Sequence, residues 1–442
     1  MKFKRVIFSS ILWRGIYFVT VLLLNIIVSR YFQAKGSGWI YYITNYFSFI
    51  ILLASLSLES GMTYFGAANR INVAKLAGFS LLWSFAVSSF VVFLVFLYGQ
   101  QQEGISKSLF IFFTIVYTIG VLLTSFFSAL FYAQQNYSMP NTLLALTNIL
   151  LVVIILLAMY SDLPRSSGHF LLKLYFANYL LQGIMLAVSF VVKNKLFRKW
   201  VLPDLPELKM LFRFSLFALL NNVLFFLLYR IDYWFVKNIC KTCLEGDLGN
   251  YIQVSKIGQL FLVLPVIIAS AIFPLTASGL QSEVNSDLPF LARTIVVFYV
   301  AVLGLLTIFG QWLFPWVYGE SFLRMYYPFV LLIPGMLSLS TIPLLTAYNS
   351  GKNKLAINMI GLVVGLTVII TGDWLLIPQF GIAAAAIVSS AGYVSYLMYL
   401  LYAHKREYKI SISHFFIPVK SDWRRLQQMF SSHETIKNVS ER

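Results

Sequence analysis

Charged residues are what this sequence lacks most. Only 11% of its 442 residues are charged, whereas a soluble domain averages roughly 25%. This balance excludes a soluble protein. Long polar segments between apolar runs are missing too, so no loop is large enough to fold as a separate domain. Short strands of alternating hydrophobicity are also absent, which argues against an outer-membrane barrel.

Cysteine is nearly absent as well. The chain has two cysteines, Cys240 and Cys243, in a loop predicted to follow the seventh helix. A structural metal site would need two more soft ligands nearby, and that loop has none. A redox role would need a thioredoxin-like context. We therefore predict two loop residues, which would form a local disulfide if the compartment oxidises them, and no metal and no cofactor.

What the sequence does contain is a series of long apolar runs. It is 59% hydrophobic and 17% aromatic, and a helix of ~20 residues crosses the hydrocarbon of a bilayer. The first run follows a basic start but is far too long for a signal peptide, so we expect an uncleaved helix. The length criterion predicts about twelve transmembrane helices, near residues 7–32, 38–66, 76–98, 107–132, 140–160, 169–192, 210–236, 249–275, 290–315, 325–349, 354–377 and 380–403.

The net charge of +17 indicates membrane topology and not nucleic-acid binding. If the N-terminus is placed in the cytoplasm, most basic residues fall in short loops and a tail on the cytoplasmic side of the membrane, as the positive-inside rule expects. Both termini are therefore predicted to be cytoplasmic. The predicted fold is an all-α polytopic membrane protein of two six-helix lobes around a central cavity, related as parallel repeats. Its parts are an N-terminal lobe, a cytoplasmic linker, a C-terminal lobe and a basic tail, at 1–192, 193–209, 210–403 and 404–442.

Charged and polar residues inside the first two predicted helices are candidates for function. Arg14 and Asn25 lie about three turns apart on one face of the first helix, and Glu59 lies in the second helix at a depth similar to that of Arg14. Charges in hydrocarbon usually face a bundle interior or a water-filled cavity. An Arg14–Glu59 ion pair, or an Arg14 that reaches the headgroups, would explain the same residues structurally.

The seventh predicted helix carries a polar stripe. Ser215, Asn222 and Tyr229 recur every seven residues and therefore share a face, and Arg230 and Asp232 flank them. Lys256 lies at a similar depth in the next helix. A salt bridge of Asp232 to Lys256 or Arg230 is one explanation, and a cavity wall for an anionic substrate is the other. Intramembrane cations outnumber intramembrane acids, which favours an unpaired cation with a function.

The succession of motifs in the second half resembles a known family. YRIDYWFV (229–236), LPVIIASAIFPLTA (264–277) and LLIPQFGIAAAAIVSSAGY (375–393) occur in order, and LESGMTYFGAANR (58–70) fits the same pattern in the first half. This order is similar to that of the polysaccharide-biosynthesis flippases of the multidrug/oligosaccharidyl-lipid/polysaccharide exporter superfamily. The resemblance extends to about Tyr402. Asp373 departs from the family pattern, and we expect it to be solvated near the outer membrane surface.

The resemblance implies a flippase of the bacterial inner membrane, not an enzyme. Its members move undecaprenyl-pyrophosphate-linked oligosaccharides, such as O-antigen or capsule repeat units, by alternating access between two lobes. The expected partners are this lipid-linked glycan, the bilayer, and a polysaccharide polymerase and glycosyltransferases, with no nucleic acid. Pyrophosphate is a multiply charged anion that a cation in a partly dry cavity attracts strongly. The candidate binding residues are accordingly Arg14, Asn25, Asn222, Arg230 and Lys256, with Glu59 and Asp232 to orient these cations or to couple transport to a proton or sodium ion.

Three other functions compete with this hypothesis. A lipid II flippase is close, although its first lobe is generally richer in arginine. A cation-coupled multidrug exporter of the same superfamily would favour acidic residues in its cavity. A membrane glycosyltransferase or polymerase would need catalytic carboxylates or histidines on a sizeable outer loop. Within the tail, residues 422–430 are expected either to form a short amphipathic helix on the inner leaflet or to be disordered.

Overall fold

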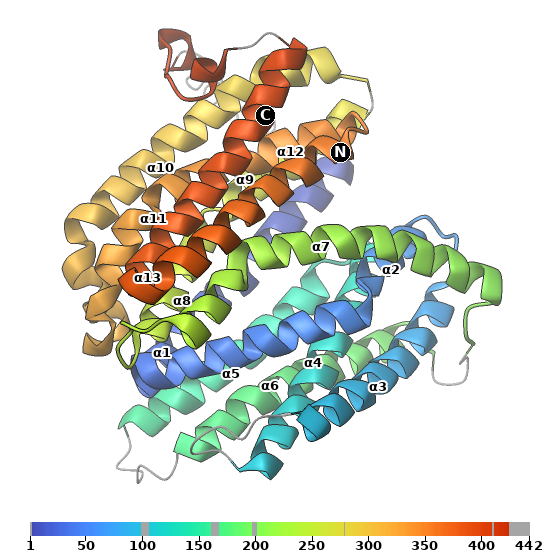
Figure 1. Cartoon of the computed structure of the whole chain (residues 1–442). Helices are drawn as coiled ribbons and strands as arrows, with labels where there is room; N and C mark the ends of the chain where they lie inside the picture. Colours follow the sequence, from blue (N-terminus) through green and yellow to red (C-terminus); the bar gives the residue numbers. More distant parts are fainter. Residues whose placement is uncertain are drawn as a thin grey trace, which may run out of the picture. The chain divides into compact units, whose positions relative to one another are not determined.

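The computed structural model describes residues 2–98, 106–160, 168–196, 201–277, 279–408 and 411–423. In these ranges the regular structure is entirely helical (Figure 1). Ten of the helices are long and apolar enough to cross a membrane. The prediction of an all-α, multi-pass membrane protein is therefore confirmed.

Two of these helices fold back on themselves. α1 (Lys2–Ser55) turns at Gln33, whose φ of 56° is left-handed. The hydroxyl of Tyr41 then donates to the carbonyl of Asn25 at 3.1 Å, which a straight helix could not allow. α13 (Leu355–Tyr408) turns at Gly381, φ 61°, and a β-carbon on Gly372 would lie 2.7 Å from Cγ1 of Val388. Counting each hairpin as two spans turns the ten helices into the twelve that were predicted.

The first compact unit comprises residues 1–230 and 317–322. Its further helices are α2 (Leu58–Ala67), α3 (Val73–Tyr98), α4 (Lys107–Ala133), α5 (Ser138–Tyr160), α6 (Gly168–Lys193) and the first part of α7 (Leu205–Ile239). α4 packs against α2, α3 and α6, and α5 packs against α1 and α6. Buried amides join these helices: Asn148 of α5 donates to Thr20 of α1 at 3.3 Å and accepts from Gln182 of α6 at 2.9 Å.

The second compact unit comprises residues 231–316 and 323–442. After the end of α7 come α8 (Asp247–Leu260), α9 (Val263–Ala277), α10 (Gln281–Tyr318), the 3₁₀ helix η2 (Glu320–Met325), α11 (Tyr326–Leu339), α12 (Ile342–Gly351), α13 and the 3₁₀ helix η3 (Ile412–Phe415). The end of α10 and the start of η2, residues 317–322, belong to the first unit. The eighth and tenth predicted helices are thus each interrupted, between α8 and α9 and between α11 and α12. α13 packs against α8, α11 and α12.

α7 contributes to both units, because residues up to Arg230 belong to the first unit and the remainder to the second. The helix begins at Leu205, five residues before the predicted start, so it includes the end of the predicted linker. The division into lobes at 193–209 stays a prediction.

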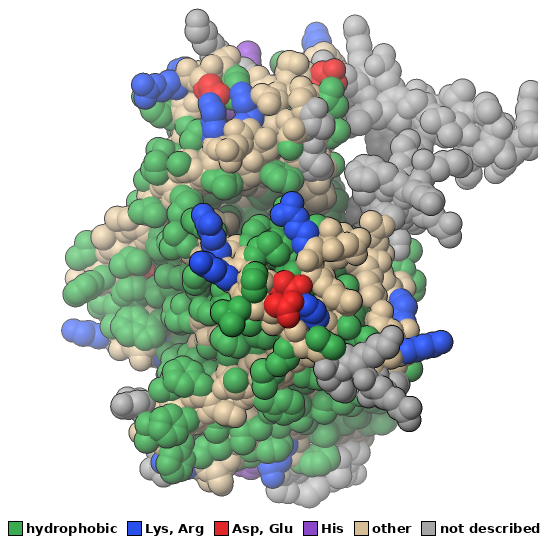
Figure 2. Space-filling model, turned by 90° about the vertical axis from the view of Figure 1, so that its right-hand side faces the viewer, with side chains coloured by type: hydrophobic (Ala, Val, Ile, Leu, Met, Phe, Trp, Pro, Cys, Tyr) green, Lys and Arg blue, Asp and Glu red, His purple; other side chains and the backbone are tan. Residues whose placement is uncertain are grey.

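Apolar side chains cover much of the surface. Hydrophobic residues spread over the face shown in Figure 2, and Phe85, Phe93 and Trp312 are among the large side chains that are more than half exposed. An apolar surface this extensive is typical of a protein that spans a membrane.

The start of the tail is docked on the protein. Arg293 of α10 donates to both carboxylate oxygens of Asp422, at 2.7 and 2.6 Å, and both residues are buried. Asp422 therefore binds α10, whereas the sequence predicts either a leaflet-bound helix or a disordered segment from this residue on. Residues 424–430 of that predicted helix lie outside the described residues.

Candidate functional site

The best-formed polar cluster surrounds Asp232, at the end of α7. Its side chain is 1% exposed and accepts hydrogen bonds from the hydroxyl of Tyr251 on α8, from Ser389 of α13 at 3.1 Å and from the backbone N–H of Tyr233 at 2.9 Å. Tyr251 and Ser389 are themselves 3.2 Å apart. Three helices of the second unit thus meet at one carboxylate.

Asp373 brings a second carboxylate to this cluster. It lies on the first leg of the α13 hairpin, within electrostatic range of Asp232 and of Tyr251. Its side chain is 0% exposed, and neither carboxylate oxygen has a hydrogen-bond partner among the described residues. The expectation that Asp373 is solvated is therefore wrong, because the residue is buried on the side of α13 that approaches Asp232 and Tyr251.

The donor set suits a small monovalent cation. Carboxylate and hydroxyl oxygens are hard ligands, and the described residues contain no group of three or more His, Cys, Asp or Glu side chains that could hold a metal ion. Two buried carboxylates with hydroxyl neighbours can bind a proton or a sodium ion, and acids inside membrane spans commonly serve such a purpose.

Two residues of the polar stripe of α7, Ser215 and Asn222, lie against the start of α2 in the first unit. The amide of Asn222 donates to the hydroxyl of Ser57 at 3.1 Å. A β-carbon on Gly61 of α2 would lie 2.6 Å from Oγ of Ser215, which shows how closely the two helices approach. The stripe therefore contributes to helix packing within this unit.

Arg230 is held without an acid. Its Nη1 donates to the side chain of Asn45 at 3.2 Å, and its guanidinium lies 5.1 Å from the centre of the Phe226 ring. Within the described residues no acidic side chain forms an ion pair with it. The guanidinium has five donors, so most of its hydrogen-bonding capacity is left for a ligand.

Arg14 is held by aromatic rings. Its guanidinium lies 4.7 Å from the ring centre of Tyr132 and 5.4 Å from that of Tyr137. No ion pair joins it to Glu59 in the part of the chain that is described. Glu59 lies in the first turn of α2 and is half-buried. The structural explanation by an Arg14–Glu59 bridge is not supported.

Two further candidates are Asn25 and Lys256. The carbonyl of Asn25 accepts from Tyr41, and its half-buried side chain makes no hydrogen bond to another described residue. Lys256 is half-buried on α8, and it is not among the residues that bond to Asp232. The predicted set therefore separates into Arg14, Asn25, Glu59, Asn222 and Arg230 in the first unit, and Asp232 and Lys256 in the second.

Sequence reasoning missed the residues that complete the acidic cluster. Tyr251 and Ser389 bond to Asp232 but are uncharged, so a search for intramembrane charges does not select them, and Asp373 is expected in solvent. One signal could have identified Ser389, because serines inside the small-residue run IAAAAIVSSAGY (382–393) are typical of a helix face that approaches its neighbours closely.

Comparison of the whole fold with solved structures gives clear matches. A lipid II flippase MurJ in an inward closed conformation has 14% identity and a TM-score of 0.70, with 96% of this chain and 93% of that chain covered. An inward-facing MATE multidrug resistance transporter of the MOP superfamily has 16% identity and a TM-score of 0.66, covering 88% and 94%. A Pyrococcus furiosus transporter of that superfamily, whose binding pocket is described as having reverse polarity, has 14% identity and a TM-score of 0.63, covering 91% and 94%.

The chain has the fold of these transporters. No family model and no curated protein matches its sequence. At identities this low the likeness establishes the fold, and the substrate has to be argued from the site.

Proposed function

We propose that this protein moves a polyprenyl-pyrophosphate-linked oligosaccharide across the bacterial cytoplasmic membrane by alternating access between two lobes. The observation that carries this proposal is Arg230, an arginine within a membrane-length helix that binds Asn45 and an aromatic ring instead of an acid. Keeping a cation in such a place without an acid partner is costly unless an anion visits it. The fold, shared with a lipid II flippase, supports the same class of cargo.

The remaining candidates take roles around this arginine. Arg14 and Lys256 would supply further positive charge for the pyrophosphate, and Asn25 and Asn222 would hydrogen-bond the sugar or phosphate. Both chain ends would be cytoplasmic. The disulfide between Cys240 and Cys243 supports this topology, because it needs an oxidising outer compartment.

The acidic cluster would bind the ion whose movement drives transport. Asp232 and Asp373, with Tyr251 and Ser389, would take up a proton or sodium ion in one state of the transport cycle and release it in the other. A coupling site of this kind lies on a different set of residues from the anion-binding cations. Glu59 is the second candidate for coupling, since it has no ion-pair partner among the described residues.

Lipid II is the second candidate cargo. The MurJ likeness favours it, and lipid II has the same polyprenyl-pyrophosphate chemistry with a different glycan. A multidrug cation is less compatible with the site, because Arg230 would repel it.

A strain that lacks the gene should accumulate lipid-linked repeat units on the inner leaflet, and the wild-type gene should clear them. We expect Arg230→Ala and Lys256→Ala to lower this clearance roughly tenfold to hundredfold, because each removes a charge-assisted contact of about 1.5–3 kcal/mol. Accumulation is measured by treating intact spheroplasts with an external glycosidase. The radiolabelled polyprenyl-linked glycans are then extracted, and those on the inner leaflet are the ones that escaped cleavage.

Arg213→Ala is the matched control, because Arg213 is an exposed arginine on the same helix and should complement like the wild type. If the deletion strain accumulates no lipid-linked glycan, the protein is not its flippase. If Arg230→Ala clears the glycan as fast as Arg213→Ala, Arg230 is not a binding residue.

A further inference from the structure

A separate cavity lies within the second unit. It has a volume of about 610 Å³ and is lined by residues from the loop before α8 and its first residue, the end of α10, η2, the start of α11 and the turn of α13. Each of these segments is at a helix end that the predicted topology assigns to the outer side. The volume is in the range of small-molecule pockets.

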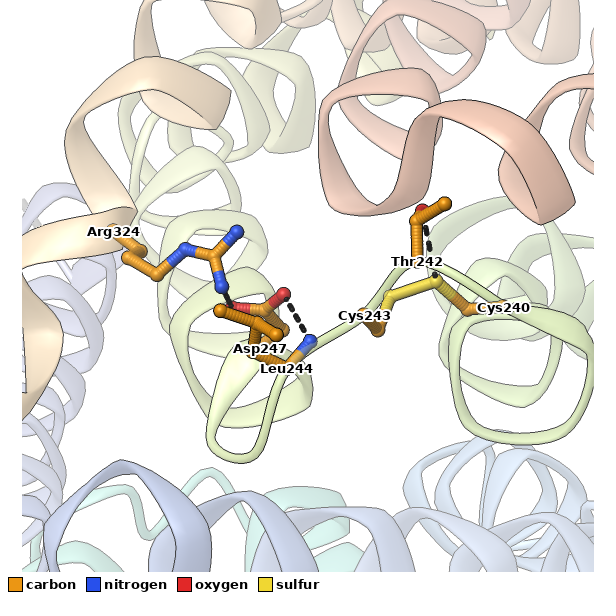
Figure 3. Close-up of a disulfide and its surroundings, with 6 residues drawn as sticks. All are labelled: Cys240, Thr242, Cys243, Leu244, Asp247 and Arg324. Atoms are coloured by element: carbon orange, nitrogen blue, oxygen red, sulfur yellow. Dashed lines mark hydrogen bonds and ion pairs between the residues drawn. A yellow bond between two sulfur atoms is a disulfide. The ribbon is translucent and has the colours of Figure 1, made fainter.

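The charges in this cavity cancel. Arg324 of η2 pairs with Asp247, the first residue of α8, at 2.9 Å (Figure 3). The carboxylate of Asp247 also accepts from the N–H of Leu244 at 2.9 Å. Its side chain is 2% exposed, whereas that of Arg324 is 48% exposed, so the guanidinium is fixed from behind and presented to the cavity. An anion would meet an arginine that is already neutralised.

The other lining groups are amides and aromatic rings. Gln311 and Gln379 each offer a donor and an acceptor, which is the requirement of a sugar hydroxyl. Tyr326, Tyr327 and Phe380 also line the cavity, and Tyr326 is oriented by its hydrogen bond to the carbonyl of Thr307 at 2.8 Å. Tyr327 and Phe380 are each 63% exposed, so their faces are open to contact.

The disulfide fixes one wall. Cys240 and Cys243 close a short loop that packs on the turn of α13, where a β-carbon on Gly381 would lie 3.1 Å from Oγ1 of Thr242 and 3.6 Å from Sγ of Cys243. Thr242 lines the cavity. Because the loop is closed covalently, the wall is formed before a ligand arrives, which lowers the entropic cost of binding.

We propose that this cavity binds a neutral saccharide. Such a ligand has hydroxyls at its edge, for the two glutamines and the free donors of Arg324, and a C–H face for the exposed aromatic rings. That the saccharide is the head of an exported lipid-linked glycan rests on the proposed function, whereas the binding itself does not. The competing explanation is that Tyr327 and Phe380 belong to an aromatic belt at the membrane interface.

The test uses the full-length protein in nanodiscs of phosphatidylcholine, because alkyl glycoside detergents would compete for the cavity. Saturation-transfer difference NMR is recorded with N-acetylglucosamine, glucose and galactose as neutral probes, and with glucuronate as an anionic one. We expect saturation transfer to at least one neutral probe. In the Tyr327→Ala/Phe380→Ala variant the Kd of that probe should rise at least about tenfold, which corresponds to about 1.4 kcal/mol of binding free energy.

Tyr402→Ala is the matched control, since Tyr402 has an exposed fraction of 61% in the same unit and does not line the cavity. It should bind the probe like the wild type. The proposal is overturned if no neutral probe receives saturation, if glucuronate alone does, or if the double variant binds as tightly as Tyr402→Ala. Helical circular dichroism and an intact disulfide confirm that the variants are folded. Glycan accumulation in the deletion strain is measured separately, so either proposal can fail without the other.

Discussion

Asp373→Asn should unfold at a higher temperature than the wild-type protein and yet transport at least about tenfold more slowly, a difference of about 1.4 kcal/mol in the transport barrier. The carboxylate of Asp373 is fully buried and has no hydrogen-bond partner among the described residues. A buried polar group in this condition carries a penalty of about 1–3 kcal/mol, more if charged, and the isosteric amide removes the part of the penalty that comes from charge. The amide cannot bind and release a cation, so the proposed coupling is lost. Unfolding is followed by intrinsic fluorescence on heating in detergent, and transport by glycan clearance in the deletion strain.

Asp232→Asn is the matched variant for this prediction. Asp232 accepts from Tyr251, Ser389 and Tyr233, and an amide weakens these charge-assisted bonds. Its thermal stability should therefore fall while its transport falls as well. The two variants are expected to change stability in opposite directions and transport in the same direction. If Asp373→Asn lowers stability, or if it transports normally, the carboxylate is not the strained member of a coupling site.

The positions of the membrane helices could be predicted from sequence because lipid imposes a simple rule. A run of apolar residues long enough to cross the bilayer has to satisfy its backbone internally and therefore becomes helical. The ends were less predictable. The predicted break between residues 377 and 380 lies close to the turn at Gly381, where a positive φ requires glycine or a strained residue. The turn at Gln33 had no such signal, since Gln33 is not a glycine.

The composition of the candidate site was only half predictable. Intramembrane charges can be read directly, and Arg230 and Asp232 were found in this way. Their partners depend on which helix faces meet, and helix period alone does not determine this. Asp232 and Ser389 bond across 157 residues of sequence. The expectation for Asp373 is wrong because an acid close to a helix end is usually solvated, and only the packing of the second unit's helices shows that this one is buried.

For the polar stripe on α7, the sequence predicts the residues that share a face but not what that face does. Its period of seven residues correctly placed Ser215 and Asn222 on one face, and that face packs against α2 and Ser57. A polar stripe that joins two helices and one that lines a cavity have the same sequence pattern. Helix packing does not explain Arg230, which follows the stripe and contacts the amide of Asn45 and the ring of Phe226.

Gly120→Ala should be the most destabilising single-methyl change in the first unit. A β-carbon on Gly120 of α4 would lie 2.3 Å from the backbone carbon and 2.4 Å from the carbonyl oxygen of Tyr179 on α6. From the other side, a β-carbon on Gly183 would lie 2.7 Å from the carbonyl oxygen of Gly120. Small residues let two membrane helices touch along their backbones, and a backbone cannot move aside as a flexible side chain can. Overpacking of a core costs about 1–3 kcal/mol, and this site should reach the upper end.

Gly304→Ala is the matched control, because Gly304 stands within α10 and has nothing within 4 Å of its would-be β-carbon. There alanine should be neutral or stabilising by up to about 1 kcal/mol, since glycine is the poorer helix former. Thermal melts of the purified variants in one detergent decide the comparison. If Gly120→Ala melts at the same temperature as Gly304→Ala, α4 and α6 are free to separate. In that case the close backbone contact contributes little to the stability of the first unit.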